Sequence, residues 1–456
     1  MNTVLETLRS TQDLRMADLF AILQIPSISS HPQHADDMKA CADAFAKLLQ
    51  RAGMTATMVH TTPGHPIVTG SWLHAPGRPT LLIYGHYDVQ PVDPLELWES
   101  APFSPCIHHE RIFARGAADD KGQILMHIHA VEAILKTHGC LPLNVIFLIE
   151  GEEEISSPNL PPFLIAEKTR LQADLAIVSD TSMWAEGIPA ITASLRGLVA
   201  LEVKVTGPDR DLHSGSFGGA VANPVEILAR MLATLKDDQG SIAIPEFYAD
   251  VQNPSLSRRQ DVANIPFDET AYCRAIGIQS SWGEAGFSIL ERIWLRPTIE
   301  INGMWGGYSG PGVKTVLPAQ AFAKLSMRLV CNQTPEATAA LVANHLRMVA
   351  PPGVTVEINK LPGGGLPWHL SLDLPAVGAA RQALADSFGI QPVIIGEGAS
   401  IPIVADFERI LSLKTLLVGF CLPDAKPHSP NENLHLPSFH TGTESLVRMM
   451  YYLGYS

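Results

Sequence analysis

Basic side chains are few relative to acidic ones in this sequence. Its 456 residues include 32 lysines and arginines against 46 aspartates and glutamates, so the formal net charge is −14. A surface that binds nucleic acid is ordinarily basic, because it has to neutralise phosphates. We therefore expect no nucleic-acid partner, and the excess of acidic side chains needs another explanation.

Long apolar runs are also missing. No uninterrupted run approaches the roughly 18–20 apolar residues that a membrane-spanning helix needs, so we expect no membrane partner. The first 20 residues carry scattered charges and no apolar core or small-residue cleavage site, unlike a secretory signal peptide. A hydrophobic fraction of 46% is nevertheless too high for a disordered chain.

Cysteine is sparse, with six scattered residues and no Cys-x-x-Cys pair. In a long chain without a signal peptide, such cysteines are ordinarily reduced, buried thiols. We therefore expect a cytoplasmic protein with more than one domain, since domains usually contain about 100–200 residues.

The N-terminal part alternates helical and strand patterns. Apolar residues at helical spacing predict helices over 36–51 and 122–138, each followed by a glycine. Short apolar runs predict buried strands at 81–84, 143–149 and 175–178. Strands separated by helices are typical of a mostly parallel sheet with helices on both faces, so we predict an α/β domain.

The pattern changes in the middle of the chain. Apolar and polar residues alternate strictly over 198–206 and 323–329, as in strands with one solvent-exposed face. Predicted helices at 223–236 and 334–349 and a strand at 354–361 complete the order of a small α+β domain. This order is that of a split-βαβ (ferredoxin-like) domain.

The last part returns to the α/β pattern. Gly363, Gly364 and Gly365 resemble a linker, and a helix at 374–388 and an apolar run at 415–420 follow. We predict that residues 1–195 and 371–456 form the larger domain and that residues 196–370 are inserted into it.

Histidine and carboxylate side chains follow the predicted strands. His86 and Asp88 come after the first strand, Glu153 and Glu154 after the second, and Asp180 after the third. In open α/β sheets, ligands bind outside the carboxyl ends of the strands. We therefore expect these side chains to line one site.

Two further segments add candidate ligands. Asp119 and Asp120 precede the helix at 122–138, and His428 follows the last apolar run. Mixed histidine and carboxylate ligands suit zinc, manganese or cobalt better than calcium. The sequence has no His-Glu-x-x-His motif, P-loop or Gly-x-Ser-x-Gly motif, which argues against those other catalytic classes.

The motifs resemble those of co-catalytic metallopeptidases, a family that includes carnosine dipeptidases, aminoacylases, succinyl-diaminopimelate desuccinylases and glutamate carboxypeptidases. The matching segments are 85–91 (Gly-His-Tyr-Asp-Val-Gln-Pro), 115–122 (Arg-Gly-Ala-Ala-Asp-Asp-Lys-Gly), 150–154, 179–180, 211–215, 310–318, 398–402 and His428. They cover nearly the whole chain in the family's order. Tyr87, Gln90 and the double aspartate make the cytosolic dipeptidase branch the most similar one.

This resemblance implies two divalent metal ions, zinc first, with manganese or cobalt as alternatives. His86 and Asp180 would bind one ion, Glu154 and His428 would bind the other, and Asp119 would bridge them. A shared anionic ligand is physically reasonable, because two cations about 3.5–4 Å apart repel each other. The resemblance also implies a cis peptide bond between Asp119 and Asp120.

Two carboxylates near the metals receive other roles. Asp88 would accept a hydrogen bond from the His86 imidazole and fix its tautomer, although a turn-forming aspartate is the rival interpretation. Glu153 would act as the general base that takes a proton from the metal-activated water and passes it to the leaving amine, while Glu154 stays ionised on the metal.

The inserted domain would serve as a lid and dimerisation domain of a homodimer. His213 would reach the partner subunit's site and stabilise an oxyanion there, the rival being an ordinary surface histidine. Arg328 would bind the terminal carboxylate of the substrate, the rival being a surface arginine on a strand. Thr315 and Ser400 would also line the substrate pocket, where Ala399 replaces a glycine of many relatives.

The resemblance thus predicts a hydrolase that cleaves dipeptides or short peptides. Deacylation of N-acyl-amino acids on the same metal core is the alternative, because the sequence does not place a group that recognises a free α-amine. A metal-binding scaffold without turnover is the third hypothesis, and the presence of every proposed ligand and of Glu153 disfavours it. The remaining histidines, His127 and His129 among them, are predicted to be structural or exposed.

Overall fold

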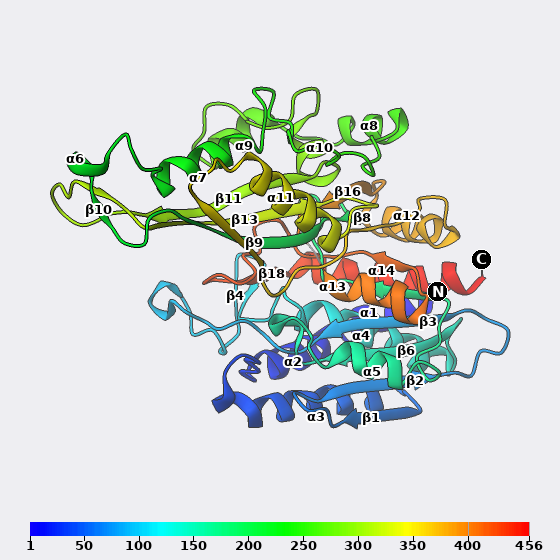
Figure 1. Ribbon diagram of the computed structural model, residues 1–456. Helices are drawn as coiled ribbons and strands as arrows, with labels where there is room; N and C mark the ends of the chain where they lie inside the picture. Colours follow the sequence, from blue (N-terminus) through cyan, green and yellow to red (C-terminus); the bar gives the residue numbers. More distant parts are fainter. Residues whose placement is uncertain (400, 456) are drawn as a thin grey trace. The chain divides into compact units, whose positions relative to one another are not determined.

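A computed structural model of the chain describes residues 1–399 and 401–455 (Figure 1). The chain separates into two compact units. Unit 1 comprises Met1–Ala193, Leu370–Ile395 and the segment that starts at Asp406, and unit 2 comprises Ser194–His369 and Gly396–Ala405. The domain boundaries expected from the sequence stay a prediction. The same holds for the role of the inserted domain as a lid or dimerisation domain.

Unit 1 is built on a mixed sheet whose strands follow the order β1-β2-β6-β3-β7-β17-β8. The strands are β1 (Ala56–His60), β2 (Ile67–Trp72), β3 (Thr80–His86), β6 (Asn144–Glu150), β7 (Leu175–Val178), β8 (Ala190–Leu195) and β17 (Thr415–Leu417). The four central strands β6, β3, β7 and β17 are parallel, and the outer pairs are antiparallel. The prediction of an α/β fold with a largely parallel central sheet is confirmed.

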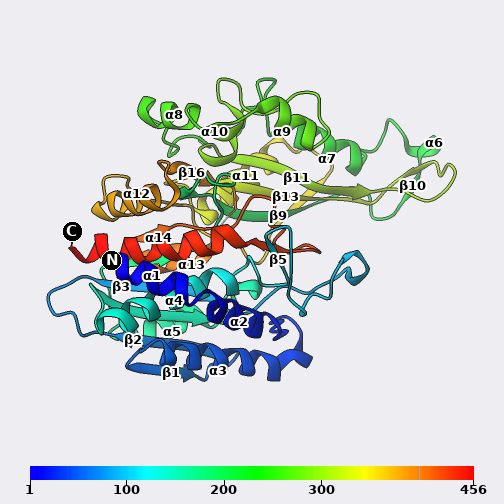
Figure 2. The ribbon, with the colours of Figure 1, turned by 180° about the vertical axis from the view of Figure 1, so that it is seen from behind.

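Helices cover both faces of this sheet. Gly85 on β3 faces α4 (Lys121–His138), because a Cβ atom at Gly85 would lie 2.8 Å from Cβ of Ile124. Tyr84 points to the opposite face, where its ring meets Phe407 with centroids 5.4 Å apart. Figure 2 shows α4 beside α14 (Leu436–Tyr455), and Figure 1 shows α5 (Leu160–Ala166) on the other side.

The other elements of unit 1 surround this core. A small antiparallel sheet in the order β18-β5-β4 is formed by β4 (Cys106–His108), β5 (Arg111–Phe113) and β18 (Asn433–His435). The remaining α-helices are α1 (Asn2–Ser10), α2 (Gln12–Leu23), α3 (Ala35–Arg51) and α12 (Pro375–Phe388). Short 3-10 helices form η1 (Pro32–His34), η2 (Leu95–Leu97) and η3 (Glu153–Ile155), and η4 (Phe407–Leu411) is a π-helix. The helices predicted at 36–51, 122–138 and 374–388 are therefore present within one residue.

The apolar run over 415–420 forms a strand only over β17. Beyond it, Gly419 passes against the backbone of Thr181, where a Cβ atom would lie 1.8 Å from the carbonyl oxygen. Phe420 is buried even though it lies outside the strand. The residues after the end of β17 are therefore apolar because they are buried and not because they belong to a strand. An apolar run in the sequence does not distinguish these two cases.

Unit 2 contains an antiparallel sheet in the order β11-β13-β9-β14. Its strands are β9 (Gly197–Thr206), β11 (Thr298–Gly306), β13 (Gln320–Leu329) and β14 (Thr355–Lys360), and its main helices are α7 (Pro224–Ala233) and α11 (Pro335–Val349). Buried and partly exposed residues alternate along β9, because one face of the sheet packs against these helices. The chain order β9-α7-β11-β13-α11-β14 confirms the split-βαβ prediction.

Unit 2 also has shorter elements. They are β10 (Leu212–His213), β12 (Val316–Leu317), β15 (Trp368–His369), α6 (Ser214–Phe217), α8 (Leu256–Ala263), α9 (Glu269–Ala275) and α10 (Ile289–Trp294); β16 (Val393–Glu397) and α13 (Pro402–Asp406) lie where the chain passes between the units. The predicted glycine linker is tied down, because Gly365 and Leu198 exchange two backbone hydrogen bonds. Among the described residues, no helix combines the length and apolarity needed to cross a membrane.

Candidate metal centre

The carboxyl ends of three parallel strands bring the predicted ligands of unit 1 together. His86 is the last residue of β3 and pairs with Glu150 at the end of β6. Glu154 lies in η3 just after β6, and Asp180 lies two residues after the end of β7. Because β6, β3 and β7 are parallel neighbours, the side chains that follow them meet at one edge of the sheet.

Asp119 reaches the same edge from the loop before α4. The peptide bond between Asp119 and Asp120 is cis, which agrees with the resemblance. Oδ1 of Asp119 lies 3.0 Å from Nε2 of His86, and Oδ2 lies 2.8 Å from Nε2 of His428. Each oxygen of one carboxylate therefore faces a different histidine.

The potential ligand atoms form two groups that share Asp119. In the first group, His86, Asp119 and Asp180 each offer an atom within 4.8 Å of the others, and in the second group Asp119, Glu154 and His428 do so. Oδ2 of Asp180 is 3.9 Å from Nε2 of His86, and Oε2 of Glu154 is 3.2 Å from Nε2 of His428. The structure thus brings together all five residues predicted as metal ligands.

This donor set fits two divalent cations. Two imidazoles and three carboxylates carry a formal charge of −3, which two divalent ions offset. Nitrogen and oxygen donors in one cluster are typical of zinc, manganese or cobalt, whereas calcium takes oxygen ligands. The shared position of Asp119 between the two groups matches a bridging carboxylate.

Crowding of these acids changes their protonation. Burial raises the pKa of the Asp180 carboxyl, and the charge of Asp119 adds to this effect, so the pKa is about 7. Burial also tends to raise the pKa of Asp119, but hydrogen bonds from His428 and His86 outweigh it and lower the pKa below its usual range. Hydrogen bonds to Asp119 and Glu154 raise the pKa of His428 to about 10. The cluster therefore has an excess of negative charge that bound cations would offset.

Glu153 belongs to neither ligand group. Burial raises the pKa of its carboxyl group well above the usual range, and the charges of Asp180 and Glu154 add to this despite the opposite effect of His86. A buried carboxyl group with a raised pKa can hold a proton at neutral pH. Neighbouring glutamates 153 and 154 therefore differ in environment, as the predicted division of their roles requires.

Asp88 is fully buried and has two kinds of contact. Nδ1 of His86 lies 3.3 Å from Oδ1 of Asp88 and 3.1 Å from its backbone oxygen, and either contact orients the ring with Nε2 toward the metal groups. The Asp88 carboxylate also accepts hydrogen bonds from the backbone amides of Glu153 (3.2 Å) and Glu154 (3.0 Å). The second role, at the loop that carries both glutamates, was not predicted from the sequence.

Gln90 is a further residue whose place the sequence did not reveal. Its side-chain amide donates a hydrogen bond of 2.8 Å to Oε2 of Glu154, the oxygen that faces His428. In the sequence, Gln90 is distinguished only as part of the motif at 85–91. Its spacing of four residues from His86 is the signal that places it at the same strand end.

The other predicted site residues belong to unit 2. His213 is exposed and pairs with Val316 across the short β10–β12 ladder, and the amide of Ser214 donates to the backbone oxygen of Thr315 (3.0 Å). The structure therefore brings the segments of His213 and Thr315 side by side. Nδ1 of His213 accepts a hydrogen bond from the amide of Gly215 (3.0 Å), which leaves Nε2 for another partner.

Arg328 lies on β13 opposite Leu198 and is partly buried. It has a cationic neighbour, Arg196, which no sequence motif indicates. Burial, followed by the charge of Arg328, lowers the pKa of Arg196 to about 10. The Arg196 guanidinium donates to the backbone oxygens of Gly398 (3.3 Å) and Arg292 (3.4 Å). Arg196 thus binds the segment that leads to Ser400, and Ser400 itself lies outside the described residues.

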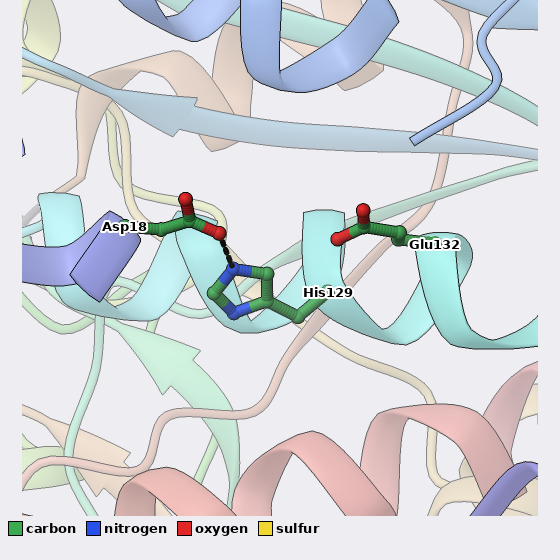
Figure 3. A group of neighbouring side chains, drawn as sticks. All are labelled: Asp18, His129 and Glu132. Carbon is green, nitrogen blue, oxygen red and sulfur yellow. Dashed lines mark hydrogen bonds and ion pairs between the residues drawn. The ribbon is translucent and has the colours of Figure 1, made fainter. Parts of the chain in front are cut away.

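A third group of possible ligands lies elsewhere in unit 1. Asp18 of α2 faces the ring of His129 on α4, with Glu132 one turn further along the same helix (Figure 3). Arg51 donates hydrogen bonds to both carboxylates, and Lys136 lies 2.7 Å from Glu132. Two cationic side chains already neutralise these acids, so the group is an ion-pair network and not a metal site.

Comparison with known proteins identifies the family. The model of peptidase family M20/M25/M40 matches residues 82–452. The chain belongs to this family. This M20-family chain is 31% identical over 457 residues to the Cys-Gly metallodipeptidase dug1 of Schizosaccharomyces pombe, covering 97% of this chain and 96% of that protein. The resemblance drawn from the motifs is confirmed.

Two solved structures are similar to this M20-family chain over nearly its whole length. Human carnosine dipeptidase 1 superposes with a TM-score of 0.80 at 28% identity, covering 100% of this chain and 99% of that one. The metallo-carboxypeptidase Sso-CP2 of Sulfolobus solfataricus superposes with a TM-score of 0.82 at 30% identity, covering 97% and 99%. The predicted class, a peptidase with metal-binding residue groups, is confirmed.

Proposed function

We propose that this protein is a two-metal dipeptidase that hydrolyses the peptide bond of dipeptides or short peptides. The observation that carries the proposal is the pair of ligand groups joined by Asp119, with Glu153 beside them. Its similarity to a Cys-Gly metallodipeptidase and a carnosine dipeptidase supports dipeptides as the substrate class. We further propose zinc as the metal, with manganese or cobalt as alternatives, and a cytoplasmic location.

The chain supplies the ligands, the base and their orientation. His86 and Asp180 would hold one cation, Glu154 and His428 the other, and Asp119 both. When bound, the two cations supply Lewis acidity toward the substrate carbonyl and lower the pKa of water. Glu153 accepts a proton from the attacking water and donates it to the nitrogen of the leaving amine. Its burial favours the second step, because a raised pKa stabilises the protonated form.

Asp88 and Gln90 keep the ligands in place in this scheme. Asp88 orients the His86 ring by contact with Nδ1, so that Nε2 would be free to bind a cation. Gln90 holds one oxygen of Glu154. Each side chain contacts a candidate metal ligand, and we propose that both are positioning residues.

We also propose roles for residues of unit 2. We propose that His213 stabilises the oxyanion formed from the carbonyl oxygen in the site of a partner subunit, in a homodimer that assembles through this unit. Its exposed ring and the orientation imposed by the Gly215 amide support this role. Arg328, Thr315 and Ser400 would bind the substrate, and a guanidinium is well suited to a terminal carboxylate.

A substrate panel on metal-loaded protein tests the proposed function. The protein is stripped with a chelator, reloaded with Zn²⁺, Mn²⁺ or Co²⁺, and assayed with dipeptides, tripeptides, β-alanyl-histidine and N-acetyl-amino acids. We expect cleavage of dipeptides, reversible loss on chelation, and little turnover of N-acetyl-amino acids. Preferential deacylation would instead establish the N-acyl-amino-acid deacylase, and no hydrolysis by any loaded form would establish the non-catalytic scaffold.

A further inference from the structure

Glu432 is a buried carboxylate that the proposed mechanism does not use. It lies four residues after His428, directly before β18, and its side chain is 0% exposed. A buried carboxylate is unfavourable unless it is paired and hydrogen-bonded. The groups that bind it therefore show what it holds in place.

Four hydrogen bonds join Glu432 to the segment that carries Asp119. Oε1 accepts from the backbone amides of Ala118 (2.9 Å) and Asp119 (3.1 Å). Oε2 accepts from the backbone amide of Gly116 (3.0 Å) and from Nη1 of Arg115 (2.7 Å). Backbone amides that converge on one anion form a nest, and here the anion is a side chain from the C-terminal part of the chain.

The surrounding contacts leave this segment little freedom. The amide of Ala114 donates to the backbone oxygen of Glu432 (3.2 Å), so both the backbone and the side chain of Glu432 bind it. A Cβ atom at Gly122 would lie 2.7 Å from the side chain of Leu434. The start of α4, which follows Asp119, therefore packs closely against β18. The Arg115 guanidinium also donates to the backbone oxygen of Pro91 (3.0 Å).

The position of Asp119 matters more than that of any other ligand, because both ion groups use it. Its own amide is one of the donors to Glu432, and its two carboxylate oxygens face His86 and His428. A shift of the 116–119 backbone would move a ligand of both groups at once. Since Glu432 is also only four residues from His428, it connects the segments that carry two of the five ligands.

We infer that Glu432 is a positioning residue for the metal pair: its carboxylate fixes the backbone of residues 116–119 so that Asp119 can serve both ions. This inference rests on the proposed two-metal function. It predicts that loss of the Glu432 charge weakens the binding of both ions, although the Glu432 side chain contacts Asp119 only through its backbone amide and contacts none of the ligand atoms of the two groups.

The test uses full-length protein stripped of metal and titrated with Zn²⁺ against a chromophoric chelator. Glu432→Gln keeps the side-chain size but replaces one acceptor oxygen with an NH₂ group that faces N–H donors. We expect both Zn²⁺ dissociation constants to rise by about 10–100-fold, the usual effect of losing a group that orients metal ligands. Saturating Zn²⁺ should restore much of the kcat for a dipeptide.

Glu132→Gln is the matched control. Glu132 is 5% exposed and is bound by Arg51, so the change also removes a buried charge from an arginine. It lies about three helical turns beyond Lys121 on α4. Zn²⁺ dissociation constants equal to those of the wild type are expected for this variant. An equal rise in both variants would overturn the inference in favour of general destabilisation.

Glu432→Asp decides the matter if Glu432→Gln does not fold, as judged by circular dichroism. Aspartate keeps the charge but is one methylene shorter, so it cannot reach all four donors, and weaker Zn²⁺ binding is expected. If the folded variant binds Zn²⁺ as tightly as the wild type, and the wild type cleaves dipeptides, the inference is wrong and the proposed function stands. A wild type that binds no Zn²⁺ or cleaves no dipeptide instead overturns the proposed function, and the inference falls with it.

Discussion

The backbone amide of Glu154 donates a hydrogen bond of 3.0 Å to Oδ2 of Asp88. The same carboxylate lies against Nδ1 of His86 through Oδ1. One buried aspartate thus connects the ends of two neighbouring strands, β3 and β6, at the point where each delivers a candidate metal ligand. Its contribution to activity should therefore come from positioning.

Asp88→Asn should lower kcat/KM by about 10–100-fold. The side-chain amide of asparagine has one acceptor oxygen where the carboxylate has two, so it loses part of the hydrogen bonds that Asp88 accepts. Asn remains similar in size, so the fold should persist. Kinetics with a dipeptide and the Zn²⁺ dissociation constants would be measured together.

Asp174→Asn is the control for this change. Oδ2 of Asp174 accepts a hydrogen bond from the amide of Thr80 (2.7 Å) at the opposite end of β3. We expect nearly wild-type kinetics for this variant. Comparable losses in the two variants would argue that Asp88 acts only through the stability of the sheet.

Glu153→Gln should retain both metal ions and lower kcat by about 10²–10⁴-fold, the usual contribution of a general acid–base group. Glutamine preserves the size of the side chain but cannot accept and return the proton. Metal content by atomic absorption and kcat at saturating dipeptide are the two measurements.

Glu152→Gln provides the comparison one residue away. The Glu152 carboxylate binds the side chain of Asn159 and the amide of His65, and it belongs to neither ligand group. This change should affect kcat far less than Glu153→Gln. Full turnover by Glu153→Gln would remove the assignment of Glu153 as the base.

His213→Ala should lower kcat strongly while metal content stays unchanged, since the imidazole is proposed to act on the oxyanion and not on a metal. His369→Ala, which alters another exposed histidine of unit 2, should behave like the wild type. Steady-state kinetics and metal analysis of the two variants test this expectation.

Mixed dimers test whether His213 acts across subunits. When His213→Ala and Glu153→Gln chains are unfolded together and refolded in equal amounts, half of the dimers should be mixed. Each mixed dimer would then contain one intact site, so about a quarter of the wild-type activity should return. Activity no higher than that of the separate variants would contradict a role in the partner's site.

Asp18 should contribute to stability in a pH-dependent way. Burial tends to raise the pKa of its carboxyl group, but hydrogen bonds from His129 and Arg51 outweigh this and lower the pKa to about 2. A carboxyl group with a depressed pKa stabilises the fold above its unfolded pKa of about 4, and this contribution disappears as the pH falls toward 2.

Asp18→Asn should therefore lower the Tm at pH 6, and the difference from the wild type should shrink as the pH falls below about 4. Asp13→Asn changes an exposed acid on the same helix and should have a smaller effect at every pH. Differential scanning calorimetry from pH 3 to pH 6 provides the comparison. A Tm difference that does not change with pH would contradict the role of the Asp18 charge.

The sequence was a good guide to the elements that carry the ligands. The apolar stripe after Asp120 predicted α4 within one residue, and the apolar run before His86 predicted the core of β3. These predictions succeed because helix and strand periodicities depend on neighbours close in the sequence. The family motifs then placed the candidate ligands on the correct strand ends.

Contacts between distant segments were decided only by the tertiary structure. His127 and His129 were expected to be structural or exposed; both are buried, His127 against Ser179 (2.8 Å) and His129 against Asp18 (3.1 Å). The hydrogen bonds between Glu432 and the segment of Asp119 span more than 300 residues. Spacing in the sequence contains no information on such pairs.

The sequence by itself determined the fold class, the family motifs and the residue types of the metal centre, because each of these rests on local pattern and chemical identity. Only the tertiary structure decided which oxygen of Asp119 faces which histidine, and that Asp88, Gln90 and Glu432 form hydrogen bonds with Glu154 or Asp119. Those relations depend on side chains that the folded chain brings within about 3 Å of each other, a distance at which hydrogen bonds form.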